Sequence, residues 1–203
     1  MIVYVETNFL LELAYLQERR ESCDLILEMA KAGEITLALP AFSAAEARAT
    51  WRHRASQRKD FYSELQRHIR EISRSETLRK LNDHWKDVVA ALVTGPEESR
   101  ERMEIAIETI GQHGEIISLD REIVSVARWF EGAYSLTPQD ALVLQSVSWH
   151  AQRNPGAKCF VTKDARGFAT PAIYDELSTV NCKVLVNFAD AVGYIRKTTQ
   201  PPT

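Results

Sequence analysis

The stretch IVYVETNFLLELA, residues 2–14, determines how the fold begins. Its first part, Ile2–Val5, is a short run of β-branched and aromatic residues, which is typical of a strand buried on both faces. The run ends at Glu6, and apolar residues then recur at helical spacing. The sequence therefore predicts a strand followed by a helix, with a carboxylate at the carboxyl tip of the strand. From this stretch alone the acid has three open roles: a helix cap, an ion-pair partner or a metal ligand.

Short apolar runs and helical patterns alternate along the rest of the chain. Parallel strands joined by helices produce this alternation, and the helices then cover both faces of the sheet. We therefore expect an α/β fold with a central parallel sheet of about five strands. Besides Ile2–Val5, strands are predicted at residues 35–39, 115–118, 159–162 and 184–186, and helices at 22–32, 120–130, 136–150 and 188–195.

One helical stretch is longer than a connection between parallel strands requires. A helix is predicted to begin at Ser43 and to run towards Gly95, with a weak break near residues 73–76. Pro96 is predicted to start a further helix that ends near Ile110. We interpret residues 50–112 as a helical insertion within a single domain that spans residues 1–203.

The composition indicates an ordinary globular protein, with 45% apolar and 26% charged residues. A net charge of -3 argues against a histone-like binder but leaves room for a local basic face. The three cysteines have no metal-type spacing and are expected to be free thiols in a reducing cytosol. No apolar run approaches the ~18 residues of a membrane span. We therefore expect a cytoplasmic protein that does not bind a membrane.

Four acidic residues are expected at one end of the predicted sheet. Glu6 follows the first strand, Glu46 lies in the first turn of the helix after the second, and Asp164 follows the fourth. Asp140 lies in the first turn of the helix that leads into the fourth strand. Ligands of open parallel sheets bind beyond the carboxyl ends of the strands. All four carboxylates are therefore predicted to converge on one crevice.

Each of these acids also has an ordinary structural role. Ser43 with Glu46, and Thr137 with Asp140, fit the helix capping box or a near relative of it. A first-turn acid gains about 0.3–1 kcal/mol from the helix dipole, and Asp164 suits a turn. As a set, however, four carboxylates in one pocket repel each other unless a cation is present or some are protonated.

Oxygen ligands are those that magnesium and manganese prefer. The cluster therefore predicts metal-assisted hydrolysis of a phosphodiester.

The chain resembles a known family, the PIN-domain ribonucleases. The family pattern has an acid-Thr-Asn after the first strand, a Glu after the second, an Asp-Ala opening a late helix and a Thr-x-Asp-x-x-Phe after the fourth. The matching segments are VYVETNFLLEL (3–13), LPAFSAAEA (39–47), SLDREIVSVARWF (118–130), LTPQDALVLQSV (136–147), FVTKDARGF (160–168) and VLVNFADAVGYI (184–195). The resemblance implies a three-layer α/β/α fold and a metal-dependent nuclease that acts on single-stranded or structured RNA.

The resemblance also implies roles for individual residues. One departure is that the family's first acid is usually Asp, whereas this chain has Glu6. The extra methylene moves the carboxylate outward, and magnesium demands near-ideal octahedral geometry. By resemblance, Glu6, Glu46, Asp140 and Asp164 would hold Mg²⁺ or Mn²⁺ and orient the attacking water, and Asn8 and Thr162 would position these carboxylates.

Residues 48–80 are strongly basic, with ten Lys or Arg against four Asp or Glu. A basic arm beside an acidic pocket suits a phosphate backbone, so we predict that Arg48, Arg52, Lys59 and Lys163 contact RNA. The alternative is a solvated helical surface with i,i+4 pairs such as Glu64 with His68.

The leading function is an endoribonuclease, and the toxin of a toxin–antitoxin pair and a housekeeping or defence ribonuclease both fit. A toxin would have a protein antitoxin as its partner, and homodimers are a tendency of the family. The alternative is a catalytically weak or inactive PIN-like module that binds RNA or protein. A phosphatase with an aspartyl nucleophile does not fit, because a Glu stands at the end of the first strand.

Overall fold

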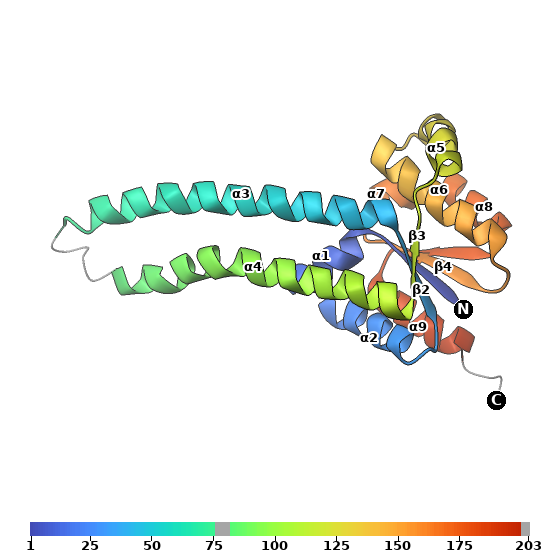
Figure 1. Ribbon diagram of the computed structural model, residues 1–203, viewed down its shortest axis with the longest axis horizontal. Helices are drawn as coiled ribbons and strands as arrows, with labels where there is room; N and C mark the ends of the chain where they lie inside the picture. Colours follow the sequence, from blue (N-terminus) through green and yellow to red (C-terminus); the bar gives the residue numbers. More distant parts are fainter. Residues whose placement is uncertain (76–81, 200–203) are drawn as a thin grey trace.

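A computed structural model describes residues 1–75 and 82–199. Its described residues form a five-stranded, all-parallel sheet in the order β3-β2-β1-β4-β5 (Figure 1). This confirms the predicted fold class, because helices pack on both faces and complete a three-layer α/β/α sandwich. The strands are β1 (Ile2–Val5), β2 (Thr36–Pro40), β3 (Glu115–Ile117), β4 (Lys158–Val161) and β5 (Cys182–Leu185).

The helices connect these strands and carry most of the chain. They are α1 (Thr7–Tyr15), α2 (Arg20–Lys31), α3 (Ala41–Ile72), α4 (Asn82–His113), α5 (Arg121–Tyr134), α6 (Pro138–Arg153), α7 (Ala165–Phe168), α8 (Pro171–Thr179) and α9 (Phe188–Thr199). Within the described ranges, no helix combines the length and the apolar character that crossing a membrane requires.

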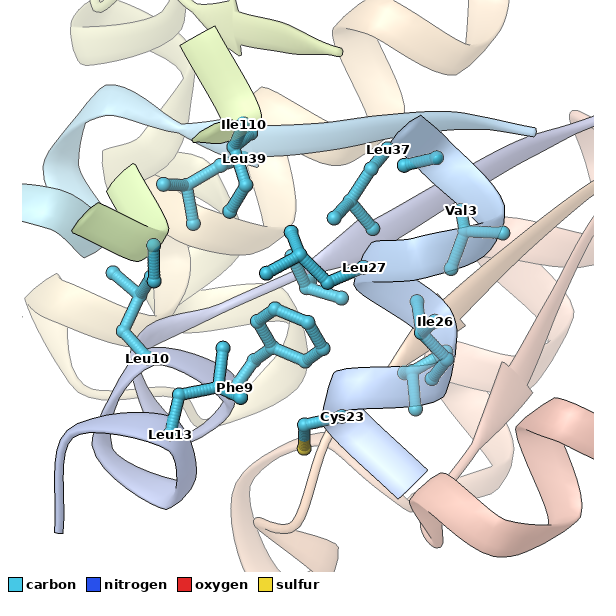
Figure 2. Packing of buried hydrophobic residues seen from close by; sticks show 14 of the residues in the cluster. Val3, Phe9, Leu10, Leu13, Cys23, Ile26, Leu27, Leu37, Leu39 and Ile110 are labelled. Atoms are coloured by element: carbon cyan, nitrogen blue, oxygen red, sulfur yellow. The ribbon is translucent and has the colours of Figure 1, made fainter. Parts of the chain in front are cut away.

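The two faces of the sheet bury separate hydrophobic clusters. Successive side chains of a strand point to opposite faces, and β1 shows this clearly. Val3 and Val5 pack with α1, α2, α4 and α9, whereas Tyr4 packs with α5, α6, α7 and α8. Figure 2 shows the first cluster, in which Phe9 and Ile26 lie under the sheet close to the strand residues. Each fully buried residue of β1 therefore packs against one of the two helix layers. This packing holds in place the strand whose carboxyl end leads into Glu6.

Helices α3 and α4 form a long antiparallel pair, which we call the helical arm (Figure 1). Each has 32 residues, so each is about 48 Å long. The sheet-proximal end of α4 belongs to the core, because Met103, Ile107 and Ile110 are buried in the first cluster. Trp51 of α3 donates its indole N–H to the carbonyl of Pro96 at 2.8 Å, which joins the two helices. The single-domain organisation with an insertion at 50–112 stays a prediction.

The structure corrects several predicted boundaries. Pro96 does not start a helix but lies inside α4, where its missing N–H removes one backbone bond and packing against α1 and α3 outweighs that loss. The helix predicted from Ser43 begins at Ala41, directly after Pro40. Helix α8 was not predicted, although Thr170 caps it and Pro171 opens it.

The remaining strand boundaries are close to those predicted. β5 begins two residues and ends one residue earlier than residues 184–186. β2 and β4 are shifted by one residue at both ends, and β3 ends one residue earlier than predicted. Helix α3 ends at Ile72, near the predicted break at 73–76, and Glu76 lies outside the described residues. Cys23, Cys159 and Cys182 are buried free thiols, as predicted.

Candidate functional site

Glu6 stands at the carboxyl tip of β1 and caps helix α1. Its carboxylate accepts the backbone N–H of Asn8 at 2.7 Å on one oxygen and the hydroxyl of Thr162 at 3.0 Å on the other. The side chain of Asn8 also hydrogen-bonds to it. Because β1 and β4 are paired neighbours, Thr162 follows β4 beside Glu6. Both residues that the resemblance assigned to carboxylate positioning therefore contact Glu6.

The environment of Glu6 makes its ionised form costly. The residue is only 4% exposed, and burial raises the pKa of its carboxyl to about 7, although hydrogen bonds from Asn8, Thr162 and the backbone of Lys163 oppose the shift. Desolvation disfavours the charged form of an acid. A nearby cation would reverse this preference, because it favours the carboxylate.

Asp164 lies directly after β4 and caps the short helix α7. One of its oxygens accepts the backbone N–H groups of Arg166 and Gly167, each at 3.0 Å. Its own backbone N–H donates to the Thr162 hydroxyl at 2.9 Å. Thr162 is fully buried. Through these two hydrogen bonds its hydroxyl connects the backbone of Asp164 to the carboxylate of Glu6.

Asp140 approaches the same place from the first turn of α6. The Thr137 hydroxyl donates to its Oδ2 at 2.6 Å, and the backbone N–H of Asp140 donates back to that hydroxyl at 3.2 Å. A Cβ built on Gly167 would lie 2.6 Å from Oδ2 of Asp164 and 3.6 Å from Oδ2 of Asp140. The two carboxylates therefore border one small space that stays open because residue 167 has no side chain.

Glu46 is held to the end of β1 by a residue that sequence reasoning missed. The hydroxyl of Thr7 donates to Glu46 Oε2 and also lies 3.4 Å from the carbonyl of Ser43. Thr7 is buried, and it is the middle residue of the Glu-Thr-Asn motif. Thr7 lies between Glu6 and Asn8 in the sequence, and this position was the signal from which a role in the site could have been predicted.

The four acids surround the carboxyl ends of β1, β2 and β4, but their side chains do not all meet. Glu46, Asp140 and Asp164 are half-buried, and Glu6 is buried. Among the residues that the structure describes, no group of three or more His, Cys, Asp or Glu side chains is close enough to hold a metal ion. The donor set nevertheless fits a hard cation, because it consists of carboxylate oxygens and because Gly167 leaves space between two of them.

The basic residues predicted to contact RNA divide into two groups. Arg48 forms a two-pronged ion pair with Glu104 of α4, with Nε to Oε1 at 2.8 Å and Nη2 to Oε2 at 2.5 Å. These hydrogen bonds raise the pKa of Arg48 and lower the pKa of Glu104. Lys163 donates to the buried carboxylate of Glu12 at 2.6 Å. Both cations are thus paired within the protein.

Arg52 and Lys59 are exposed on α3, and no ion pair joins either of them to another described residue. Farther along α3, Glu64 lies 3.7 Å from Arg67 and 4.0 Å from His68. This part of the arm has the short-range pairs of a solvated helical surface. Arg79 and Lys80, which contributed to the basic count, lie outside the described residues.

The three-layer fold is that of a PIN domain, and a family model for the PIN domain matches residues 3–168. The matched range covers most of the chain and includes all four acids, so the protein belongs to the PIN-domain family. Members of this family are typically nucleases and generally use divalent metal ions. No curated protein and no solved structure matches the chain.

Proposed function

We propose that this protein is a metal-dependent endoribonuclease that hydrolyses phosphodiester bonds of RNA at the carboxyl ends of β1, β2 and β4. One observation carries the proposal: carboxylates of Asp140 and Asp164 border the same space above Gly167, and Thr162 connects Asp164 to Glu6. Membership of the PIN-domain family supports it.

In this proposal, Glu6, Glu46, Asp140 and Asp164 together hold Mg²⁺ or Mn²⁺. When bound, the ion supplies a water of lowered pKa and offsets the charge of the phosphate. The chain's own residues fix the geometry. Thr162 and Asn8 hold Glu6, Thr7 holds Glu46, and the α7 backbone holds Asp164.

The Glu at position 6 is compatible with activity. Its longer side chain is anchored at both oxygens, so the carboxylate is fixed at the strand tip. Hydrogen-bonded partners of this kind orient metal ligands. Activity with the longer acid is therefore expected, and a comparison of Mn²⁺ with Mg²⁺ tests whether the altered reach changes the metal preference.

Cleavage of a mixed RNA pool by the purified protein, with Mn²⁺, with Mg²⁺ and with a chelator, tests the proposal. We expect metal-dependent cutting that is lost in Asp140→Asn. Glu122→Gln is the matched control, because Glu122 is also a first-turn acid but pairs with Arg153 and Trp149. A folded protein that binds RNA but cuts with neither metal would contradict the proposal and support the inactive PIN-like module.

Narrower assignments belong to the same proposal. The toxin of a toxin–antitoxin pair would arrest growth when expressed, whereas the Asp140→Asn variant would not, and a protein antitoxin would relieve the arrest. A homodimer would be visible by light scattering. Arg52 and Lys59 would contact the RNA backbone, and the buried free thiols support a reducing, cytoplasmic location.

A further inference from the structure

Glu12 is the most deeply buried carboxylate that the proposed chemistry does not use. It lies in the last turns of α1 and is 1% exposed. Its two oxygens are both engaged: Oε1 accepts the ammonium of Lys163 at 2.6 Å, and Oε2 accepts the backbone N–H of Arg19 at 2.9 Å. Because Oε1 is paired with an ammonium, the charge of Glu12 is already balanced within the protein without a metal ion.

The partner of Glu12 belongs to the segment that carries the candidate site. Lys163 stands between Thr162, which donates to Glu6, and Asp164. The backbone N–H of Lys163 itself hydrogen-bonds to Glu6. One residue therefore bonds Glu6 through its main chain and Glu12 through its side chain.

Electrostatics favour this pair over an ammonium that points into water. A carboxylate near the end of α1 faces the negative end of the helix dipole, and a cation there is favourable. A buried carboxylate without a partner would be strongly destabilising. The ammonium of Lys163 places a cation at this end of the helix and also pairs with the buried carboxylate. Its side chain is 44% exposed.

We propose that Glu12 is a positioning residue, which through the ammonium of Lys163 clamps the segment 162–167 against α1 and so fixes Asp164 and the donors to Glu6. We refer to the pair of Glu12 with Lys163 as the clamp. Its meaning for metal binding and catalysis rests on the proposed nuclease function. In this assignment the ammonium of Lys163 has a structural role. It pairs with Glu12 instead of making the RNA contact that the sequence predicted.

The variant Glu12→Gln tests the clamp with little change of shape. We expect backbone hydrogen exchange of Asp164, Arg166 and Gly167 to become faster, while β4 keeps its wild-type exchange. The dissociation constant for Mn²⁺ should rise about 10-fold, as is typical when a partner of a metal ligand is removed. The turnover number should fall in parallel, and the Michaelis constant for RNA should not change.

Three further variants separate the clamp from simpler explanations. Lys163→Arg should retain wild-type exchange, metal affinity and turnover, because it keeps the cation. The double variant Glu12→Gln with Lys163→Met should behave as Glu12→Gln does, since it removes the clamp without leaving an unpaired buried charge. Asp24→Asn removes the acid of an exposed ion pair with Arg20 on α2 and should change nothing.

Two results would overturn the clamp. One is a folded Glu12→Gln protein with wild-type exchange of residues 164–167 and wild-type Mn²⁺ affinity. The other is a Lys163→Met protein with normal metal binding, a raised Michaelis constant and a salt slope reduced by about one, which is the behaviour of a phosphate contact. A wild-type protein that neither binds Mn²⁺ nor cuts RNA would contradict the nuclease proposal instead, and the exchange experiment would still decide the clamp.

Discussion

The carboxyl edge of the sheet and the helical arm use the same charged residue types in opposite ways. At the sheet edge, acids that are far apart in the sequence come together, and hydroxyls and backbone N–H groups from other elements hold them. In the arm, several charges that are dense in the sequence pair within one helix or across to a neighbour, such as Arg67 with Glu64 and Arg48 with Glu104. Charge density along a chain is therefore a weaker guide to a site than position in the topology.

The arm shows how a basic stretch can serve packing. Arg54 and Arg58 lie over the ring of Tyr15, at 4.8 and 5.2 Å from its centroid. Arg48 joins α3 to α4 through Glu104. The cation–π contacts stabilise the packing of α3 against α1, and the ion pair joins the two helices of the arm. Of the residues predicted to contact RNA in the arm, Arg48 is paired with Glu104, and no ion pair joins Arg52 or Lys59 to another described residue.

The largest effect is expected in the pH dependence of stability. It arises from Glu6, the buried acid at the sheet edge, and not from the exposed acids of the arm. Because the folded-state pKa of Glu6 is raised from 4.5 to about 7, its protonated form stabilises the metal-free protein at low pH. That stability is lost as the pH rises from 4.5 to 7, by roughly 3 kcal/mol. Urea unfolding in chelator at several pH values measures it.

Glu6→Gln should remove this pH dependence, and Glu122→Gln should keep it. If the wild-type protein and Glu6→Gln lose stability equally over this window, Glu6 is not buried as described.

The second prediction concerns the space above Gly167. In Gly167→Ala the new Cβ would meet Asp164 Oδ2 at 2.6 Å and displace that carboxylate. We expect Mn²⁺ affinity and RNA cleavage to fall by about 10- to 100-fold, with little loss of stability. Gly132→Ala in α5 is a matched control, because nothing lies within 4 Å of its added Cβ. Equal activity of the two variants would argue against a metal position beside Gly167.

The third prediction concerns the two exposed cations of the arm. Replacing Arg52 and Lys59 by Gln should weaken RNA binding and reduce the salt slope by about one for each phosphate contact that is lost. The turnover number at saturating RNA should not change, because neither residue belongs to the proposed metal site. Binding measured at several salt concentrations by fluorescence anisotropy provides the test, and an unchanged slope would favour a solvated surface.

The smallest effect is expected at the ion pair of Arg48 with Glu104. Both side chains are partly exposed, so Glu104→Gln should cost only about 0.2–1 kcal/mol of stability. RNA affinity should not fall, since the variant frees a cation. Thermal unfolding and the same binding assay measure both quantities. Weaker RNA binding in this variant would show that the orientation of the arm matters for RNA.

The sequence was sufficient for the sheet and for most of the candidate site. Buried parallel strands are continuous apolar runs, so their carboxyl ends, and with them Glu6, Glu46 and Asp164, could be located from the sequence. Asn8 and Thr162 followed from the family pattern, and both contact Glu6. The family and the fold class are confirmed, whereas the metal-binding roles stay a prediction.

What the sequence could not provide depends on contacts between distant segments. Glu12 and Lys163 are 151 positions apart, and nothing in either local pattern connects them. Thr7 has the polarity of an ordinary cap residue, and only the approach of α3 brings Glu46 to its hydroxyl. Pro96 has the local signature of a helix start, but tertiary packing keeps α4 continuous through it.

The central claim is that carboxylates at the edge of the sheet hold one divalent cation. A crystal structure of the protein soaked with Mn²⁺, with anomalous scattering recorded from the metal, tests it most directly. We predict an anomalous peak within about 2.0–2.6 Å of oxygens of Asp140 and Asp164, the range for hard cations, and no such peak in Asp140→Asn. A saturating soak that places Mn²⁺ elsewhere, or leaves this position without a peak, would contradict the account.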